Sequence, residues 1–217
     1  MRKVPLATDC VYHIFTKSID KNVVFKENSD YIRLIEAIKY YIYETLPFNF
    51  AAYCKLRDKN TFISKYDLNS KKLVVDIIAY CIMPTHIHLV LKQLVDNGIF
   101  IFLRKLLNSY TRYYNIKNER SGPLWQGRFK NVLVDSNEQL LHLTRYVHLN
   151  PTTAGIVKNP EDWPYSSYLE YLNISNDKIC NYYKYLDIDM KDYKEFVDNR
   201  KDYQRELGLI KHLTFEE

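Results

Sequence analysis

The chain has 217 residues, a formal net charge of +5 and four cysteines that form no Cys-x-x-Cys pair. A chain of this length suits one domain with an elaboration and buries roughly 70% of its unfolded surface, so its core needs no disulfide staples. No segment reads as a signal peptide, and no apolar run approaches the ~20 residues of a membrane span. We therefore expect a soluble, cytoplasmic protein with reduced thiols and no membrane partner.

The N-terminal part predicts a strand, a helix and an insertion. Residues 11–16 are β-branched and aromatic, as in a strand. A helix with apolar residues on one side follows, capped by Ser29 or Asp30 and running to about Thr45. Residues 48–55 favour a strand or an apolar insertion.

The middle of the chain predicts a β-hairpin. Residues 58–70 are expected to form a loop with some extended structure. Residues 73–83 then give a near-continuous β-branched and aromatic run, and Pro84-Thr85 turns the chain into a further strand over 86–92. The two strands would lie in the middle of a sheet.

The remaining elements complete a fold class. Residues 99–116 predict a second helix, 129–134 a fourth strand, and 137 to about 149 a third helix capped by Asp135 or Ser136. The order strand, helix, strand, strand, helix, strand, helix predicts an α+β sandwich, with helices on one face of a mostly antiparallel sheet.

A C-terminal helical extension follows this sandwich. It is expected to hold a short helix ending near Leu172 and a charged helical tail over residues 189–207. We therefore divide the chain into a main domain over residues 1–155 and an extension over 156–217 packed on it.

The head of the strand 86–92 is the most informative feature. Side chains alternate faces along a strand, so His86 and His88 project together while Ile87 points into the core. Their Cα atoms would lie about 6–7 Å apart, a spacing suited to one metal ion. Packed core histidines, or an exposed pair at a strand end, are the structural alternatives.

A polar stripe follows the predicted helix 137–149. His142, Tyr146 and Asn150 are four residues apart and share one helical face, which is either the solvent face or part of a site. Asn150 precedes Pro151, which disfavours α conformation there, so we expect Asn150 in a frayed last turn from which it could reach a bound ion.

These groups together suggest phosphodiester chemistry. Two imidazoles, an amide oxygen and water form a mixed site that suits Mg²⁺ or Mn²⁺ better than a Cys-rich zinc site does. Such an ion can polarise a phosphodiester while a tyrosinate attacks phosphorus. Because a phenol has a pKa near 10, it needs activation by the ion, a base or a cationic neighbour.

The positive charge is concentrated between Arg104 and Arg145, where eight basic residues stand against three acidic ones. Tyrosine, tryptophan and phenylalanine residues are interleaved with them. Cations beside stackable rings suit single-stranded nucleic acid, and a solvated helix face is the alternative. The candidates for contacts to DNA phosphates are Arg112, Arg128, Lys130 and Arg145.

Five ordered blocks resemble the single-tyrosine HUH transposases of insertion sequences, and within them the REP-associated tyrosine transposases. The blocks keep that family's order and spacing over about residues 8–172. The insertion 48–70 is longer than the compact family pattern, and no familiar motif follows Leu172. The blocks are Tyr80-Cys81-Ile82-Met83-Pro84-Thr85-His86-Ile87-His88-Leu89, Gly122-Pro123-Leu124-Trp125-Gln126-Gly127-Arg128-Phe129-Lys130, Arg145-Tyr146-Val147-His148-Leu149-Asn150-Pro151, Ala154-Gly155 and Trp163-Pro164-Tyr165-Ser166-Ser167-Tyr168.

The resemblance implies a ferredoxin-like catalytic domain over residues 1–155. A divalent ion would be held by His86 and His88, with Asn150 where such proteins place a third polar ligand. Tyr146 would be the nucleophile, giving a 5′-phosphotyrosine and a free 3′-OH. The partner would be single-stranded DNA with hairpins, cut and rejoined in DNA transposition, and a homodimer is left open.

Two other functions stay open. The first is a domesticated module that binds DNA or RNA hairpins without cutting them. The second is a small-molecule metal hydrolase, which would stay active after Tyr146→Phe. Among the remaining residues, we expect His13 to be structural, His148 to face away from the site and Trp163 to anchor the core. The block around Trp125 is either a packed lead-in to a strand or a DNA contact.

Overall fold

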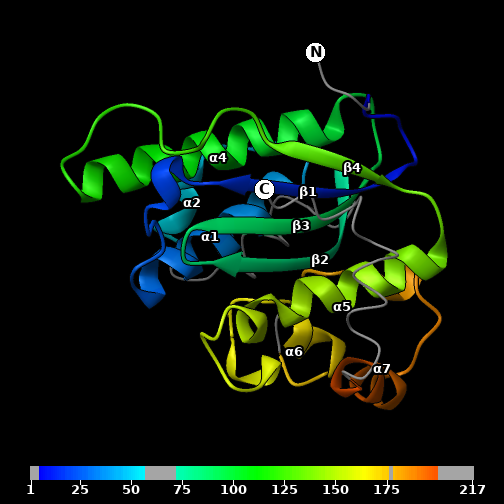
Figure 1. Cartoon of the computed structure of the whole chain (residues 1–217). Coiled ribbons are helices and arrows are strands. Elements are labelled where there is room, and N and C mark those ends of the chain that lie inside the picture. Colours follow the sequence, from blue (N-terminus) through cyan, green and yellow to red (C-terminus); the bar gives the residue numbers. More distant parts are fainter. Residues whose placement is uncertain (1–4, 57–71, 176–177, 200–217) are drawn as a thin grey trace.

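The structure is a computed structural model that describes residues 5–56, 72–175 and 178–199 (Figure 1). The described part is built on one antiparallel sheet in the order β2-β3-β1-β4. With helical chain between the first two strands and again between the last two, this is the ferredoxin-like arrangement, so the predicted α+β class is confirmed. The strands are β1 (Val11–Lys17), β2 (Val75–Met83), β3 (His86–Gln93) and β4 (Lys130–Val134).

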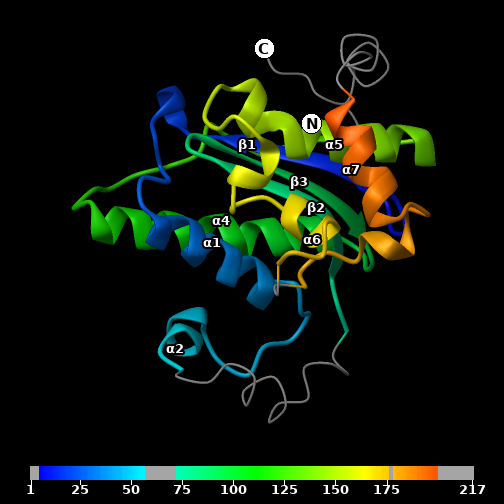
Figure 2. The same ribbon diagram turned by 90° about the horizontal axis from the view of Figure 1, so that it is seen from below.

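Helices cover both faces of the sheet. The prediction of helices on one face describes α1 (Asn28–Tyr41) and α4 (Gly98–Lys117), which lie together on one side. Helix α5 (Asn137–Thr153) crosses the other side (Figure 2). The second layer is required because every residue of β2 is buried, so neither of its faces can be left to solvent.

Helix α1 is fixed at its start by a buried carboxylate. It begins at Asn28, just before the predicted caps, because Glu27 and Asp30 form a capping box. Asp30 also binds the Lys117 ammonium at 2.6 Å and the Tyr113 hydroxyl at 2.9 Å, which ties α1 to α4. Burial alone would raise the pKa of Asp30, but Lys117 and the N–H donors of Lys26 and Glu27 hold that pKa below its ordinary value.

The segment after α1 is helical, not extended. Helix α1 ends at Tyr41, earlier than predicted, because Tyr43 pairs with Leu73 in a β-bridge. The apolar insertion then forms the short helix α2 (Phe50–Cys54), where Asn49 accepts the Ala52 N–H at 2.9 Å. The loop expected over 58–70 lies outside the described residues.

The C-terminal extension completes the core. Its elements are the 3₁₀ turns η3 (Pro160–Asp162) and η4 (Tyr182–Lys184), with α6 (Tyr168–Tyr171) and α7 (Met190–Asp198). Chain 165–167 pairs with the outer edge of β2, since the Ile82 N–H donates to the Tyr165 carbonyl and the Ser167 N–H to the Tyr80 carbonyl, both at 2.9 Å.

The predicted core anchor Trp163 donates its indole N–H to the Ile82 carbonyl at 3.1 Å. The helical tail ends at Asp198, and the rest of the predicted helix, 200–207, lies outside the described residues. One further 3₁₀ turn, η1 (Ile19–Lys21), follows β1. Across the residues that the structure describes, no helix is both long and apolar enough to traverse a bilayer.

Candidate metal and nucleophile site

Strand β3 presents its two histidines to the face of the sheet that α5 covers. His86 and His88 lie on one side of the strand, with ring centres 5.0 Å apart and ring planes at 84°. His88 is fully buried, whereas His86 is partly exposed, with its Nδ1 2.9 Å from the Thr85 hydroxyl. The pair therefore opens from the core toward solvent at one end of the sheet.

His13 of β1 holds the His88 ring. The His13 Nε2 lies 3.0 Å from the His88 Nδ1, and the two rings stack with centres 5.2 Å apart. With Nδ1 engaged, His88 would bind a metal ion through Nε2. The neutral ring then carries its proton on Nδ1, so His88 donates and His13 accepts. The expected structural role of His13 is thus one of orienting a candidate ligand.

Helix α5 places Tyr146 over these rings. The Tyr146 ring centre lies 5.8 Å from that of His88 and 6.2 Å from that of His13, edge-on to both. Only 8% of Tyr146 is exposed. Strands β1 and β3 and helix α5, far apart in the sequence, thus bring a phenol and three imidazoles into one cluster.

Asn150 lies one helical turn beyond Tyr146 on the same face of α5. The expectation of a frayed last turn is wrong, because α5 continues through Pro151 to Thr153 and the Ala154 N–H donates to the Asn150 carbonyl. The Asn150 amide nitrogen donates to the Tyr146 carbonyl at 2.9 Å. Its side-chain oxygen is therefore the atom that Asn150 would offer to a cation.

The donor set fits a hard divalent cation. Within the described ranges, no three His, Cys, Asp or Glu side chains gather as a metal site. An ion here would rest on the nitrogens of His86 and His88, the amide oxygen of Asn150 and water. Such a mixed set suits Mg²⁺ or Mn²⁺, whereas structural zinc requires four protein ligands.

Two cations flank the histidines. The strand register sets Lys17 directly opposite His86, and Phe15 opposite both His88 and Lys130. Lys130 is exposed, with its ammonium 5.8 Å from the centre of the Phe15 ring. Neither lysine forms an ion pair with another described residue. Sequence reasoning missed Lys17, because only the β1–β3 register brings it to the site.

The Gly-Pro-Leu-Trp block is mainly a structural lead-in to β4. Trp125 is buried beside Phe25 and Tyr110, with ring centres 6.3 and 6.0 Å away. Gly127 has φ +68°, a conformation that favours glycine. Arg128, directly after this turn, is exposed and remains a candidate for contact with DNA.

Arg145 has a structural role instead of the predicted phosphate contact. Only 3% of it is exposed, and its guanidinium lies 3.7 Å from the centre of the Phe196 ring. It donates to the Phe196 carbonyl at 2.7 Å and lies 3.1 Å from the His142 Nδ1. His142, the first residue of the polar stripe, therefore contacts α7 through the same cluster.

His148 faces away from Tyr146, as expected. Its ring nitrogens lie 2.7 Å from the Tyr193 hydroxyl and 2.7 Å from the Ser167 hydroxyl. Complete burial lowers the pKa of His148 to about 3, so the ring is neutral and joins α5 to the extension.

Arg112 is separated from this site by the sheet. It is exposed on α4, which packs against the face opposite α5 (Figure 2). Of the four predicted phosphate contacts, Arg128 and Lys130 therefore lie at the strand end next to the histidines. Arg112 lies on the opposite face of the sheet, and Arg145 lies in the core.

The fold and the cluster point to one class of protein. The family model described as "Transposase IS200 like" matches residues 52–150, which include the two histidines, Tyr146 and Asn150. A solved structure of a REP-associated tyrosine transposase bound to a REP hairpin shares the fold at a TM-score of 0.55. It is 15% identical and covers 83% of this chain and 96% of its own. The matched residues and the shared fold point to the IS200-like transposases.

Two curated relatives narrow this class. A protein of Haemophilus influenzae assigned as a REP-associated tyrosine transposase is 32% identical over 120 residues, which are 50% of this chain and 68% of that protein. The REP-associated tyrosine transposase of Escherichia coli K12 is 27% identical over 94 residues, 43% of this chain and 54% of that protein. The chain belongs to the REP-associated tyrosine transposase family.

Proposed function

We propose that this transposase cleaves and rejoins single-stranded DNA near hairpins, with Tyr146 as the nucleophile. The observation that carries the proposal is the position of the Tyr146 ring, 5.8 Å from that of His88 and on the same face as Asn150. The hairpin substrate is supported by the structural neighbour, which was solved with a REP hairpin.

The reaction is a transesterification. The Tyr146 oxygen forms a bond to phosphorus, the bond from phosphorus to the 3′ oxygen breaks, and the phenol proton passes to solvent or a base while the leaving oxygen takes up a proton. The products are a 5′-phosphotyrosine and a free 3′-OH, and the reverse attack of a 3′-OH rejoins the strand. No energy cofactor is consumed, because the phosphodiester energy is conserved in the covalent link.

The chain's own residues position the reacting groups. His86, His88 and Asn150 would hold the divalent ion, and His13 keeps the His88 ring in place. When bound, Mg²⁺ or Mn²⁺ supplies Lewis-acid polarisation of the scissile phosphate. Lys17, Arg128 and Lys130 would hold neighbouring phosphates, the two lysines as point charges and the arginine through its forked guanidinium.

The test is formation of a covalent adduct. Wild-type protein with Mn²⁺ and labelled single-stranded oligonucleotides from its own genomic flanks should give a denaturant-resistant protein–DNA adduct. Tyr146→Phe should give none, because it lacks the attacking oxygen. Tyr183→Phe, an exposed position on η4, is the matched control and should behave as wild type.

The other outcomes separate the alternatives. Hairpin binding without an adduct in wild type would indicate a non-cleaving module. Metal-dependent hydrolysis that survives Tyr146→Phe would indicate a hydrolase with water as the nucleophile. The homodimer stays a prediction, which the sedimentation mass of the protein with and without hairpin DNA would test.

A further inference from the structure

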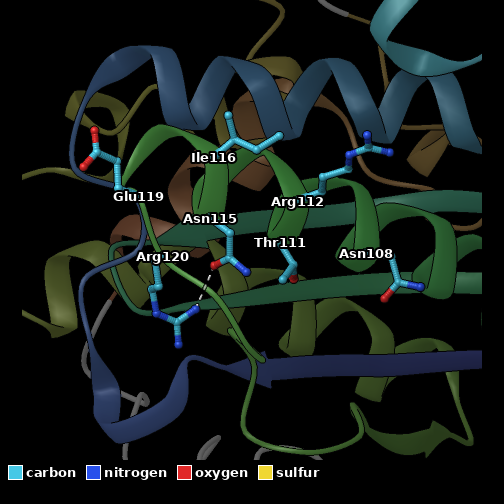
Figure 3. Close-up of a pocket in the computed structure, with 7 residues that line it drawn as sticks. All are labelled: Asn108, Thr111, Arg112, Asn115, Ile116, Glu119 and Arg120. Atoms are coloured by element: carbon cyan, nitrogen blue, oxygen red, sulfur yellow. Dashed lines mark hydrogen bonds between the residues drawn. The ribbon is translucent and has the colours of Figure 1, made fainter.

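A second, independent feature lies on the side of the sheet that faces away from Tyr146. Helices α1, α2 and α4 line an open cavity of about 750 Å³. A smaller cavity of about 520 Å³ follows α4 toward Arg120 and shares Asn108, Arg112 and Ile116 with the first. Figure 3 shows this second stretch, with Arg112 and Ile116 on the side of α4 turned toward α1. The two cavities form one groove along α4.

The larger cavity is strongly cationic. Arg33, Lys105, Arg112 and Lys117 line it, and among the described residues no acidic side chain does. Lys117 is paired with Asp30 and Glu27. The other three cations form no ion pair or hydrogen bond with any described side chain. Like charges gathered in one cleft repel one another, so the arrangement favours an anionic ligand.

Arg33 lies close to two aromatic rings. Its guanidinium carbon lies 4.4 Å from the centre of the Phe50 ring and 5.3 Å from that of Tyr113. The Arg33 Nε is buried and has no hydrogen-bond partner among the described residues. Arg33 and Tyr113 are partly exposed, whereas Phe50 is buried beneath them. A guanidinium beside a partly exposed tyrosine ring is a surface on which unpaired bases stack. Asn49, Asn108 and Ser109 add amide and hydroxyl groups that can reach base edges.

We propose that this groove binds a few unpaired nucleotides of single-stranded DNA, at a site distinct from the Tyr146 site. The cavity volume is that of a small-ligand pocket and suits unpaired nucleotides better than a duplex. Phe50 and Asn49 belong to the insertion that exceeds the compact family pattern, so the groove also gives that insertion a role. The proposal does not depend on cleavage by Tyr146.

The experiment measures binding by fluorescence anisotropy, in EDTA, to a labelled thymidine oligonucleotide of about 12 nucleotides. Lys105→Glu/Arg112→Glu should weaken binding by at least about 10-fold at ~0.1 M salt, and the slope of log affinity against log salt should fall by about 1.4. The matched control is Arg104→Glu/Lys178→Glu, which reverses two exposed charges that do not line the groove. It should bind within about twofold of wild type.

Two further results decide the proposal. Crosslinking of an oligonucleotide that carries 5-iodouracil should label the α4 peptide containing Tyr113, and labelling of β3 or α5 peptides alone would overturn it. Equal losses in both double variants, no loss in either, or tighter binding of uridine than of thymidine oligonucleotides would also overturn it. Tyr146→Phe should keep the groove affinity, and the groove variant should still form the adduct at saturating DNA, so each proposal can fail without the other.

Discussion

At the scale of single residues, the contact between His13 and His88 gives the clearest prediction about metal binding. A metal-binding imidazole whose second nitrogen is held by a neighbour keeps its ring orientation and tautomer. We therefore expect His13→Phe to weaken Mn²⁺ affinity by roughly 10–100-fold, measured by calorimetry without DNA. His13→Gln, which keeps a polar group at this position, should recover part of the loss.

The control for this prediction is His142→Phe. His142 contacts Phe196, with ring centres 5.4 Å apart, and lies outside the histidine cluster. Its substitution should leave Mn²⁺ affinity unchanged. A wild-type Mn²⁺ affinity in His13→Phe would show that β1 does not support the ion site.

How far these residues could be predicted depends on the range of the pattern that reveals them. The alternation of side chains along a strand was enough to place His86 and His88 together. His13 and Lys17 reach them only through the register of β1 against β3, and His13 and His88 are 75 positions apart in the sequence. The spacing of residues within one segment does not reveal how two distant strands pair, so both residues were missed as parts of the site.

At the scale of elements, α5 has two polar sides with different roles. Tyr146 and Asn150 face the sheet, whereas Arg145 and His148 join the helix to α7 and α6. The sequence pattern of the helix was sufficient to place Tyr146 and Asn150 on one face. It could not tell a buried arginine from one that contacts phosphate, because that difference depends on Phe196, a residue 51 positions away.

Substitutions of the buried Arg145 and of the exposed Lys130 should have different effects on stability and on DNA binding. Arg145→Met should lower the free energy of unfolding by about 2 kcal/mol, because it removes a hydrogen bond to the Phe196 carbonyl and the stacking on its ring. It should leave DNA affinity unchanged. Lys130→Met should do the opposite, lowering DNA affinity and its salt dependence while the unfolding midpoint stays the same.

Urea unfolding followed by circular dichroism, together with anisotropy on hairpin oligonucleotides, gives both quantities for each variant. If Arg145→Met lost DNA affinity but kept full stability, Arg145 would be a phosphate contact after all.

The segment 48–55 could not be assigned from local sequence either. Asn49 caps the start of α2, but an asparagine also suits a turn, so its presence did not distinguish a helix from the predicted strand.

At the scale of the whole molecule, the predicted boundary at residue 155 falls between two parts of the chain that share one core. The extension supplies Ser167 and Tyr193 to the buried His148, and it covers the outer edge of β2 through residues 165–167. The Tyr171 hydroxyl donates to the Ile78 carbonyl at 2.8 Å within the same layer. The sequence indicated an extension that packs on the domain, but not that it covers the β2 edge of the sheet.

A fragment of residues 1–155 should therefore fail to unfold cooperatively. It would leave both nitrogens of His148 without their partners in an apolar site and expose the bare edge of β2, which favours aggregation. A fragment of residues 1–199 retains every contact named here and should melt in one cooperative transition in calorimetry. A sharp, reversible melt of the 1–155 fragment, with Mn²⁺ binding intact, would instead show that the ferredoxin-like domain is independent and that the extension serves another purpose.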